Sequence, residues 1–190
     1  MAGGAPLAAA HGLEFFASSE NARAIVQEHM GELIGQANPI KAMRKMQELL
    51  PILRAGEEQQ YRVWLEASEG SGVVISQPFF APHGLSIAEK IGARYIEAAL
   101  QPVLPTREFP PPALPPLPLG GLLNRASYGL YGQMTWQMAR ASINHWRVNV
   151  LALPPLPFAG YQRRLRESGS LHLCGVSQHV IPRPTDWEDR

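Results

Sequence analysis

A strand–helix–strand pattern in the middle of the chain constrains the fold more than any other feature. Residues 73–76 form a β-branched run that is typical of a buried strand. Residues 83–91 have helical spacing and end at Gly92, and residues 95–100 form a second apolar run. Because two strands joined through one short helix lie parallel with a right-handed crossover, the sequence predicts an α/β fold with a parallel sheet.

Shorter patterns predict the remaining elements. Helical spacing of apolar side chains predicts helices at residues 22–33, 40–50, 57–67 and 122–146. Short apolar runs predict strands at residues 13–16 and 171–177. Residues 181–190 are charged and interrupted by proline, so we expect them to begin a linker.

The loops that follow the two central strands indicate where a ligand binds. Both strands of a parallel pair end at the same edge of the sheet, and ligands of open α/β sheets bind outside that edge. The loops at residues 77–82 and 101–121 therefore face one crevice, whose aromatic side chains suit a flat apolar alcohol. The predicted acceptor-binding residues are Gln77, Phe79, Phe80, His83, Thr106, Phe109, Tyr128 and Tyr131.

The second of these loops is rich in proline. Residues 101–120 hold eight of the chain's 18 prolines, a composition that resists helix and sheet. Residues 112–115 have the spacing of a ligand for SH3 domains, so a proline-motif interaction protein is one interpretation. We favour a stiff loop inside a folded domain, because both flanks of the segment have the patterns of regular structure.

Composition excludes several classes of protein. A net charge of +1 over 190 residues excludes a strongly basic nucleic-acid binder. The single cysteine, Cys174, excludes an intramolecular disulfide framework and a four-cysteine zinc site. No apolar run approaches the ~20 residues of a membrane-spanning helix.

Individual polar residues predict little chemistry on their own. His83 follows the first crevice loop and is the one candidate for a catalytic contact with the acceptor hydroxyl, although such a histidine more often packs at a helix start. His172, Cys174 and His179 invite comparison with a metal site, but their spacing matches no zinc module, so we predict a buried thiol and surface imidazoles. The sequence therefore predicts no metal and no bound cofactor.

Six segments together resemble one enzyme family. Their order and spacing are similar to those of the N-terminal, acceptor-side domain of GT-B glycosyltransferases, above all sterol and lipid glucosyltransferases and the related macrolide and glycopeptide glycosyltransferases. The segments at residues 105–110 and 182–187 carry most of the resemblance. The others are residues 11–16, 87–92, 119–121, and 144–147 together with 153–156.

The resemblance implies a function and a domain organisation. It implies a partial Rossmann-like sheet in which residues 13–180 form an incomplete acceptor-binding domain, residues 1–12 a remnant, and residues 181–190 the start of an interdomain linker. The complete enzyme would transfer a hexose from a nucleotide sugar, UDP-glucose, to a hydroxyl of a sterol, lipid or other apolar acceptor. The donor domain would be a partner absent from this chain, which alone would be inactive. Its expected location is the cytoplasm, with peripheral membrane contact as an open alternative.

Another interpretation shares the same crevice. A non-catalytic module for an apolar ligand or a protein, derived from such a domain, would also have apolar loops at the sheet edge. Adjoining reading frames that encode a glycine-rich loop and a donor domain would favour the enzyme. The sugar, the acceptor, the catalytic base and the oligomeric state do not follow from the sequence.

Overall fold

The computed structural model describes residues 4–17, 59–112, 114 and 120–187. The chain divides into two units, Met1–Glu69 and Gly70–Arg190, and each is considered by itself. The helices predicted at residues 22–33 and 40–50 lie outside the described residues.

The first unit contains two described helical segments. Helix α1 (Ala5–Ala10) is a short helix with proline in its first turn, and residues 59–67 are helical, as the spacing over 57–67 predicts. The strand predicted at residues 13–16 is wrong, because those residues form no strand and Phe15 instead lies against Gly4. An apolar run becomes a strand only where another strand supplies its backbone hydrogen bonds.

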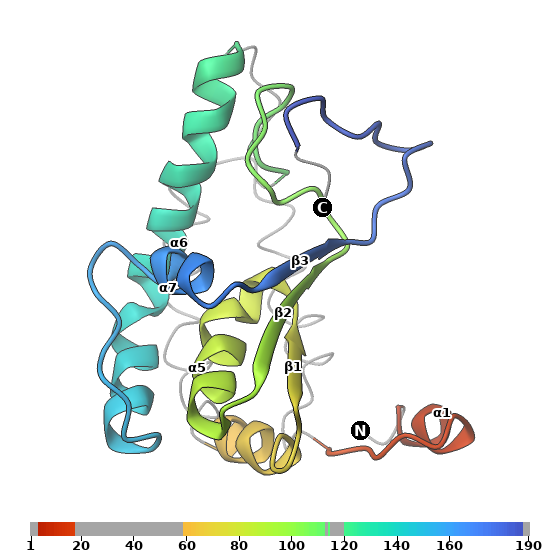
Figure 1. Cartoon of the computed structure of the whole chain (residues 1–190), viewed down its shortest axis with the longest axis vertical. Helices are drawn as coiled ribbons and strands as arrows, with labels where there is room; N and C mark the ends of the chain where they lie inside the picture. Colours follow the sequence, from red (N-terminus) through yellow and green to blue (C-terminus); the bar gives the residue numbers. More distant parts are fainter. Residues whose placement is uncertain (1–3, 18–58, 113, 115–119, 188–190) are drawn as a thin grey trace, which may run out of the picture. The chain divides into compact units, whose positions relative to one another are not determined.

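The second unit is built on a parallel three-stranded sheet (Figure 1). Its strands are β1 (Val73–Ser76), β2 (Arg94–Ala99) and β3 (Leu171–Cys174), in the order β1-β2-β3. Ile75 pairs with Ile96 and Glu97 with His172, and both strand pairs are parallel. The prediction of an α/β fold with a partial Rossmann-like sheet is confirmed.

Helix α5 (Ala81–Ile91) connects β1 to β2 and covers one face of the sheet. It begins two residues earlier than the sequence predicts, because a 3₁₀ turn, η2 (Pro78–Phe80), leads directly into it. It ends at Gly92, whose φ of 72° is the left-handed conformation that glycine adopts most readily. The core on this face comprises Ala81, Leu85, Ala88, Tyr95 and Leu165.

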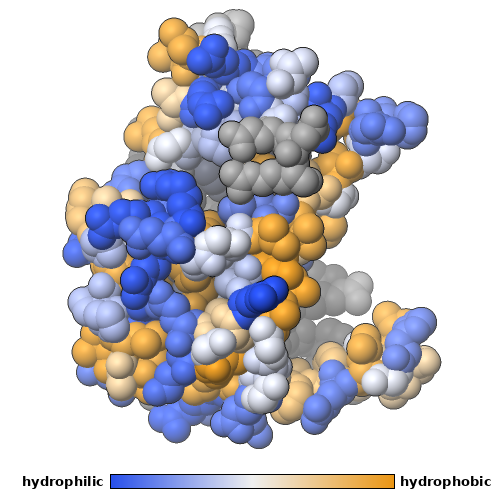
Figure 2. All heavy atoms as spheres, viewed as in Figure 1, coloured by the Kyte–Doolittle hydropathy of each residue, from blue (hydrophilic) through white to orange (hydrophobic). Residues whose placement is uncertain are grey.

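The opposite face of the sheet presents apolar side chains. Val73 and Ile75 of β1 are 45% and 60% exposed, and Leu171 and Leu173 of β3 are 56% and 51% exposed. Figure 2 shows apolar side chains gathered over the strands in this view. Among the described residues of this unit, α5 and Leu165 pack against the other face.

A long helix forms the other side of the second unit. Helix α6 (Gly121–Asn149) runs past α5, and the short helix α7 (Gln162–Glu167) precedes β3 (Figure 1). Trp136 and Ile143 of α6 form a second core with Leu156. The indole of Trp136 donates to the carbonyl of Phe158 at 3.1 Å, so the chain after α6 folds back along the helix.

Strand β3 is shorter than the predicted run at residues 171–177. Its last registered pair joins Cys174 to Ala99, which is also the last residue of β2. Beyond Cys174 the neighbouring strand β2 has ended, so residues 175–177 have no strand beside them to continue the parallel pairing.

Candidate acceptor-binding site

The chain segments that follow β1 and β2 leave the same edge of the sheet. The two strands are parallel, with Ser76 opposite Glu97 near their carboxyl ends. η2 begins directly after β1, and the loop that contains residues 100–112 begins directly after β2. This placement is the one that the strand–helix–strand pattern predicts.

Aromatic rings continue from this edge into the interface between α5 and α6. Phe79 is 82% exposed, and its ring meets that of Phe80 edge-on at 5.0 Å. His83 lies 6.1 Å from Phe80 and 6.0 Å from Trp146 of α6, measured between ring centroids. Gln77 is exposed at the start of η2.

His83 is a neutral packing residue in this arrangement. Burial lowers its pKa to about 4, because the charged imidazolium loses hydration between α5 and α6. A general base works best with a pKa near the working pH, so this imidazole is poorly suited to remove a proton from a hydroxyl at neutral pH. Its position beside Trp146 agrees with packing at a helix start.

The loop after β2 is fastened to the end of the described chain. The Thr106 hydroxyl donates to Asp186 at 2.6 Å, and the Arg107 backbone N–H donates to the same carboxylate at 3.0 Å. Arg125 of α6 forms an ion pair with Asp186 at 3.2 Å. Glu108 accepts hydrogen bonds from the Thr185 backbone N–H at 2.7 Å and the Thr185 hydroxyl at 3.0 Å. We call residues 106–108 with Thr185 and Asp186 the clasp.

The clasp joins the two segments that carry most of the family resemblance. The hydrogen bond from Thr106 is the largest influence that lowers the pKa of Asp186, which keeps the carboxylate ionised. Sequence reasoning places Asp186 in a linker and does not predict this contact. The motif at residues 182–187 indicated that this segment is important, but the sequence does not indicate that the motif contacts residues 105–110.

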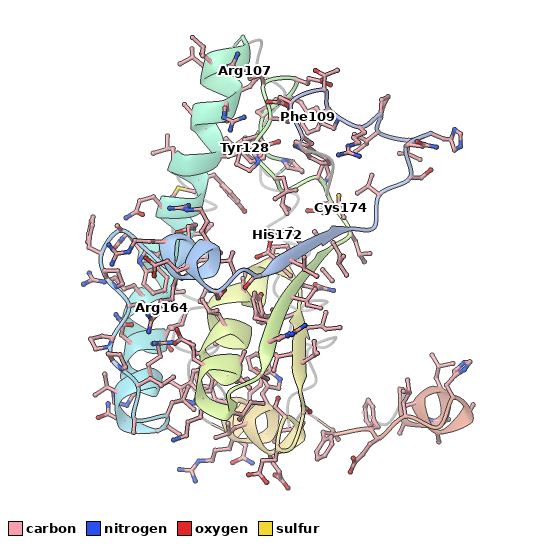
Figure 3. The ribbon with its side chains drawn as sticks, in the orientation of Figure 1. Arg107, Phe109, Tyr128, Arg164, His172 and Cys174 are labelled. Carbon is pink, nitrogen blue, oxygen red and sulfur yellow. The ribbon has the colours of Figure 1, made fainter. Side chains whose placement is uncertain are left out.

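Two polar side chains on α6 face the clasp loop. Asn124 and Tyr128 are only 7% and 8% exposed. The Asn124 amide donates to the carbonyl of Arg107 at 3.1 Å, but among the described residues neither Asn124 Oδ1 nor the Tyr128 hydroxyl has a hydrogen-bond partner. Burial, with a smaller contribution from Asp186, raises the pKa of Tyr128 to about 12. Figure 3 shows Tyr128, Arg107 and Phe109 in the same part of the unit.

The structure thus gathers the eight predicted residues into two groups. Gln77, Phe79, Phe80 and His83 lie at the end of β1 and the start of α5. Thr106 and Phe109 lie on the loop after β2, and Tyr128 and the half-buried Tyr131 lie on α6. One surface depression of about 320 Å³ lies elsewhere on α6 and is lined by Gln137, Arg140, Ala141 and Asn144, none of which is a predicted site residue.

A buried charge network fixes the helices behind the site. Arg147 of α6 is 1% exposed and pairs with Glu89 of α5 at 2.7 Å. It also donates to the Ser86 hydroxyl at 2.8 Å and the Pro154 carbonyl at 3.0 Å. Arg164 of α7 also pairs with Glu89 at 2.7 Å, so Glu89 joins Arg147 and Arg164 in one ion-pair network. Sequence reasoning missed the network, although an arginine among the apolar positions of a helix is a signal.

Asn144 fastens the segment that follows α6. Its amide donates to the carbonyl of Leu156 at 3.0 Å and accepts from the Leu156 backbone N–H at 2.8 Å. The two segments that the resemblance joins, residues 144–147 and 153–156, are therefore in contact.

Within the described ranges, no three histidine, cysteine, aspartate or glutamate side chains are grouped so that they could hold a metal ion. The imidazole of His172 lies 3.2 Å from the carboxylate of Glu97 on the neighbouring strand. No helix in the part of the chain that the structure describes has the length and hydropathy to cross a membrane.

Curated relatives match this chain over a minor part of their own length. The sterol 3-beta-glucosyltransferase of Cryptococcus neoformans is 31% identical over 140 residues, which cover 69% of this chain and 8% of the relative. Those of Neurospora crassa and Candida albicans are both 30% identical and cover 68% and 70% of the chain, each with 9% of the relative. No protein-family model matches the chain. The predicted resemblance to sterol glucosyltransferases is confirmed, and the chain spans less than a tenth of these relatives.

Proposed function

We propose that this chain, a relative of part of the fungal sterol 3-beta-glucosyltransferases, is the acceptor-binding part of a glycosyltransferase that acts on a sterol. The observation that carries the proposal is the shared sheet edge, where the segments after the parallel strands β1 and β2 bring aromatic side chains to the crevice position of an α/β fold. UDP-glucose is the proposed donor, and a separate donor domain is the proposed partner.

Apolar surface at this edge suits a sterol ring system. Phe79 and Leu100 are 82% and 75% exposed, and Phe80 is 36% exposed. Burial of such side chains against a flat apolar ligand is favourable by about 25 cal/mol per Å² of apolar surface. The clasp restrains the loop that carries Phe109, which reduces the entropy lost when a ligand orders that loop.

The proposal assigns substrate positioning to this chain. Glycosyl transfer needs a base for the acceptor hydroxyl, stabilisation of the departing diphosphate and alignment of the two reactants. The low pKa of His83 argues against assigning it the first of these tasks. The described residues therefore bind and orient the acceptor in this proposal.

Binding of dehydroergosterol, a fluorescent sterol, tests the proposal. We expect saturable binding of dehydroergosterol to the chain. The measurement is energy transfer from the tryptophans of the chain to the bound sterol. Phe109→Ala should weaken binding by about 1–3 kcal/mol, the scale for losing one buried apolar side chain. Arg163→Ala is the control, because Arg163 is 71% exposed and pairs with Glu167 at 3.6 Å on the surface of α7. Absence of saturable binding, or equal effects of the two substitutions, would overturn the proposed function.

A further inference from the structure

Two unsatisfied polar atoms lie on one face of α6. Asn124 and Tyr128 are four residues apart, so their side chains project from the same side of the helix. Long side chains in a helix lean toward its N-terminus, which places the Tyr128 ring over the turn that holds Asn124. Both residues are more than nine-tenths buried, and Asn124 Oδ1 and the Tyr128 hydroxyl have no hydrogen-bond partner among the described residues.

The chemical identity of the two atoms is well defined. Asn124 donates through Nδ2 to the carbonyl of Arg107 at 3.1 Å, which leaves Oδ1 as an acceptor. Burial raises the pKa of Tyr128 to about 12, so its phenol keeps its proton and remains a donor at neutral pH. A buried polar atom without a hydrogen-bond partner is unfavourable, so both atoms favour an incoming partner.

A neutral hydroxyl satisfies both atoms. A hydroxyl group accepts one hydrogen bond and donates another, whereas a carboxylate or phosphate would bring two acceptors and no donor. The carboxylate of Asp186 acts on Tyr128 electrostatically and would repel a second anion. An alcohol is therefore the ligand chemistry that this donor and acceptor recognise.

We propose that Asn124 and Tyr128 form the subsite that binds the hydroxyl of the acceptor, with Tyr128 donating a hydrogen bond to its oxygen and Asn124 Oδ1 accepting the hydrogen bond that the hydroxyl donates. This inference rests on the proposed function and adds to it the residues that distinguish an alcohol from a hydrocarbon of the same shape. The hydrogen bond from Asn124 Nδ2 to the carbonyl of Arg107 fixes the amide so that Oδ1 remains available to the hydroxyl.

Tyr128→Phe removes the donor and retains the ring. The measurement is displacement of dehydroergosterol by cholesterol and by cholestane, which lacks the hydroxyl. We expect the unaltered chain to prefer cholesterol, and Tyr128→Phe to reduce that preference about three- to tenfold, the effect of one hydrogen bond, with the affinity for cholestane unchanged. Tyr161→Phe is the matched control, because Tyr161 is not a predicted acceptor-binding residue and packs against Trp136 with a ring-centroid distance of 5.9 Å, so this variant should leave the preference unchanged.

The outcomes separate this inference from the proposed function. A chain that binds dehydroergosterol but keeps its full preference for cholesterol in Tyr128→Phe overturns the subsite alone. A chain that binds no sterol overturns the proposed function and the subsite with it. The melting temperature of Tyr128→Phe should stay the same or rise, because the Tyr128 hydroxyl makes no hydrogen bond to the described residues. A fall would indicate a structural water in place of a ligand hydroxyl and would overturn the subsite.

Discussion

The hydroxyl of Thr106 donates a 2.6 Å hydrogen bond to the carboxylate of Asp186, 80 residues further along the chain. Thr106 has no exposed surface, and its hydroxyl oxygen also accepts from the backbone N–H of Glu108 at 3.1 Å. One buried side chain therefore shapes the loop after β2 and fastens it to the end of the described chain.

Thr106→Val should destabilise the second unit. Valine has nearly the same shape but cannot donate to Asp186 or accept from Glu108, so we expect the free energy of unfolding to fall by about 1–3 kcal/mol. Urea denaturation followed by tryptophan fluorescence measures the change. Thr106→Ser keeps the hydroxyl and should lose less; an equal loss in both variants would contradict the assignment of the stability to the hydroxyl's hydrogen bonds.

Stability should decrease as the pH falls from 6.5 toward 4 because of His83. Its pKa is about 4 in the folded chain and about 6.5 in an unfolded one, so the unfolded state binds more protons between these values. The contribution is complete above pH 6.5 and is lost as the pH falls to about 4. Urea denaturation across this range measures it.

His83→Phe is the variant that removes this pH dependence while keeping an aromatic ring between Phe80 and Trp146. His179→Phe is the control, because His179 is exposed. A pH profile of His83→Phe with the same slope as that of the unaltered chain would show that other groups cause the dependence.

Arg147→Met should be among the most damaging substitutions in the second unit. It leaves the Glu89 carboxylate without its buried partner and removes the bonds to Ser86 and Pro154. Removal of one partner of a buried ion pair costs about 3–5 kcal/mol, and Arg164 compensates in part, so we expect the lower end of this range. Arg164→Met, at a side chain 48% exposed, should cost less than about 1 kcal/mol, the scale of surface pairs. Thermal unfolding compares the two, and similar costs would contradict the assigned burial.

Gly84→Ala should destabilise the contact between α5 and the sheet. A β-carbon at Gly84 would lie 2.7 Å from Ser76 Oγ and 2.7 Å from the Tyr95 ring, which are themselves joined by a 2.8 Å hydrogen bond. Such overpacking costs about 1–3 kcal/mol. Gly129→Ala on α6 is the control, because a β-carbon there would meet nothing within 4 Å and alanine favours helix by about 1 kcal/mol. Opposite signs for the two changes in unfolding free energy are the expected result.

The sequence by itself determined the βαβ unit, because its signals are local. The β-branching of residues 73–76, the helical spacing of residues 83–91 and the left-handed turn at Gly92 act on neighbouring residues, and the observed elements agree with them to within two residues. The sequence also determined the relationship to sterol glucosyltransferases, through the order of its motifs.

Only the tertiary structure decided which distant side chains meet. The apolar run at residues 13–16 has the composition of a strand, yet Phe15 packs against Gly4 instead. Two polar pairs show the same dependence, namely Thr106 with Asp186 and Glu89 with Arg147. The residue type alone does not predict which partner each of them contacts, and the path of the chain brings each pair together. Hydrogen bonds and ion pairs depend on distances of a few ångströms in space and not on separation in sequence. These contacts therefore form only when the folded sheet and helices bring the two residues of each pair close together.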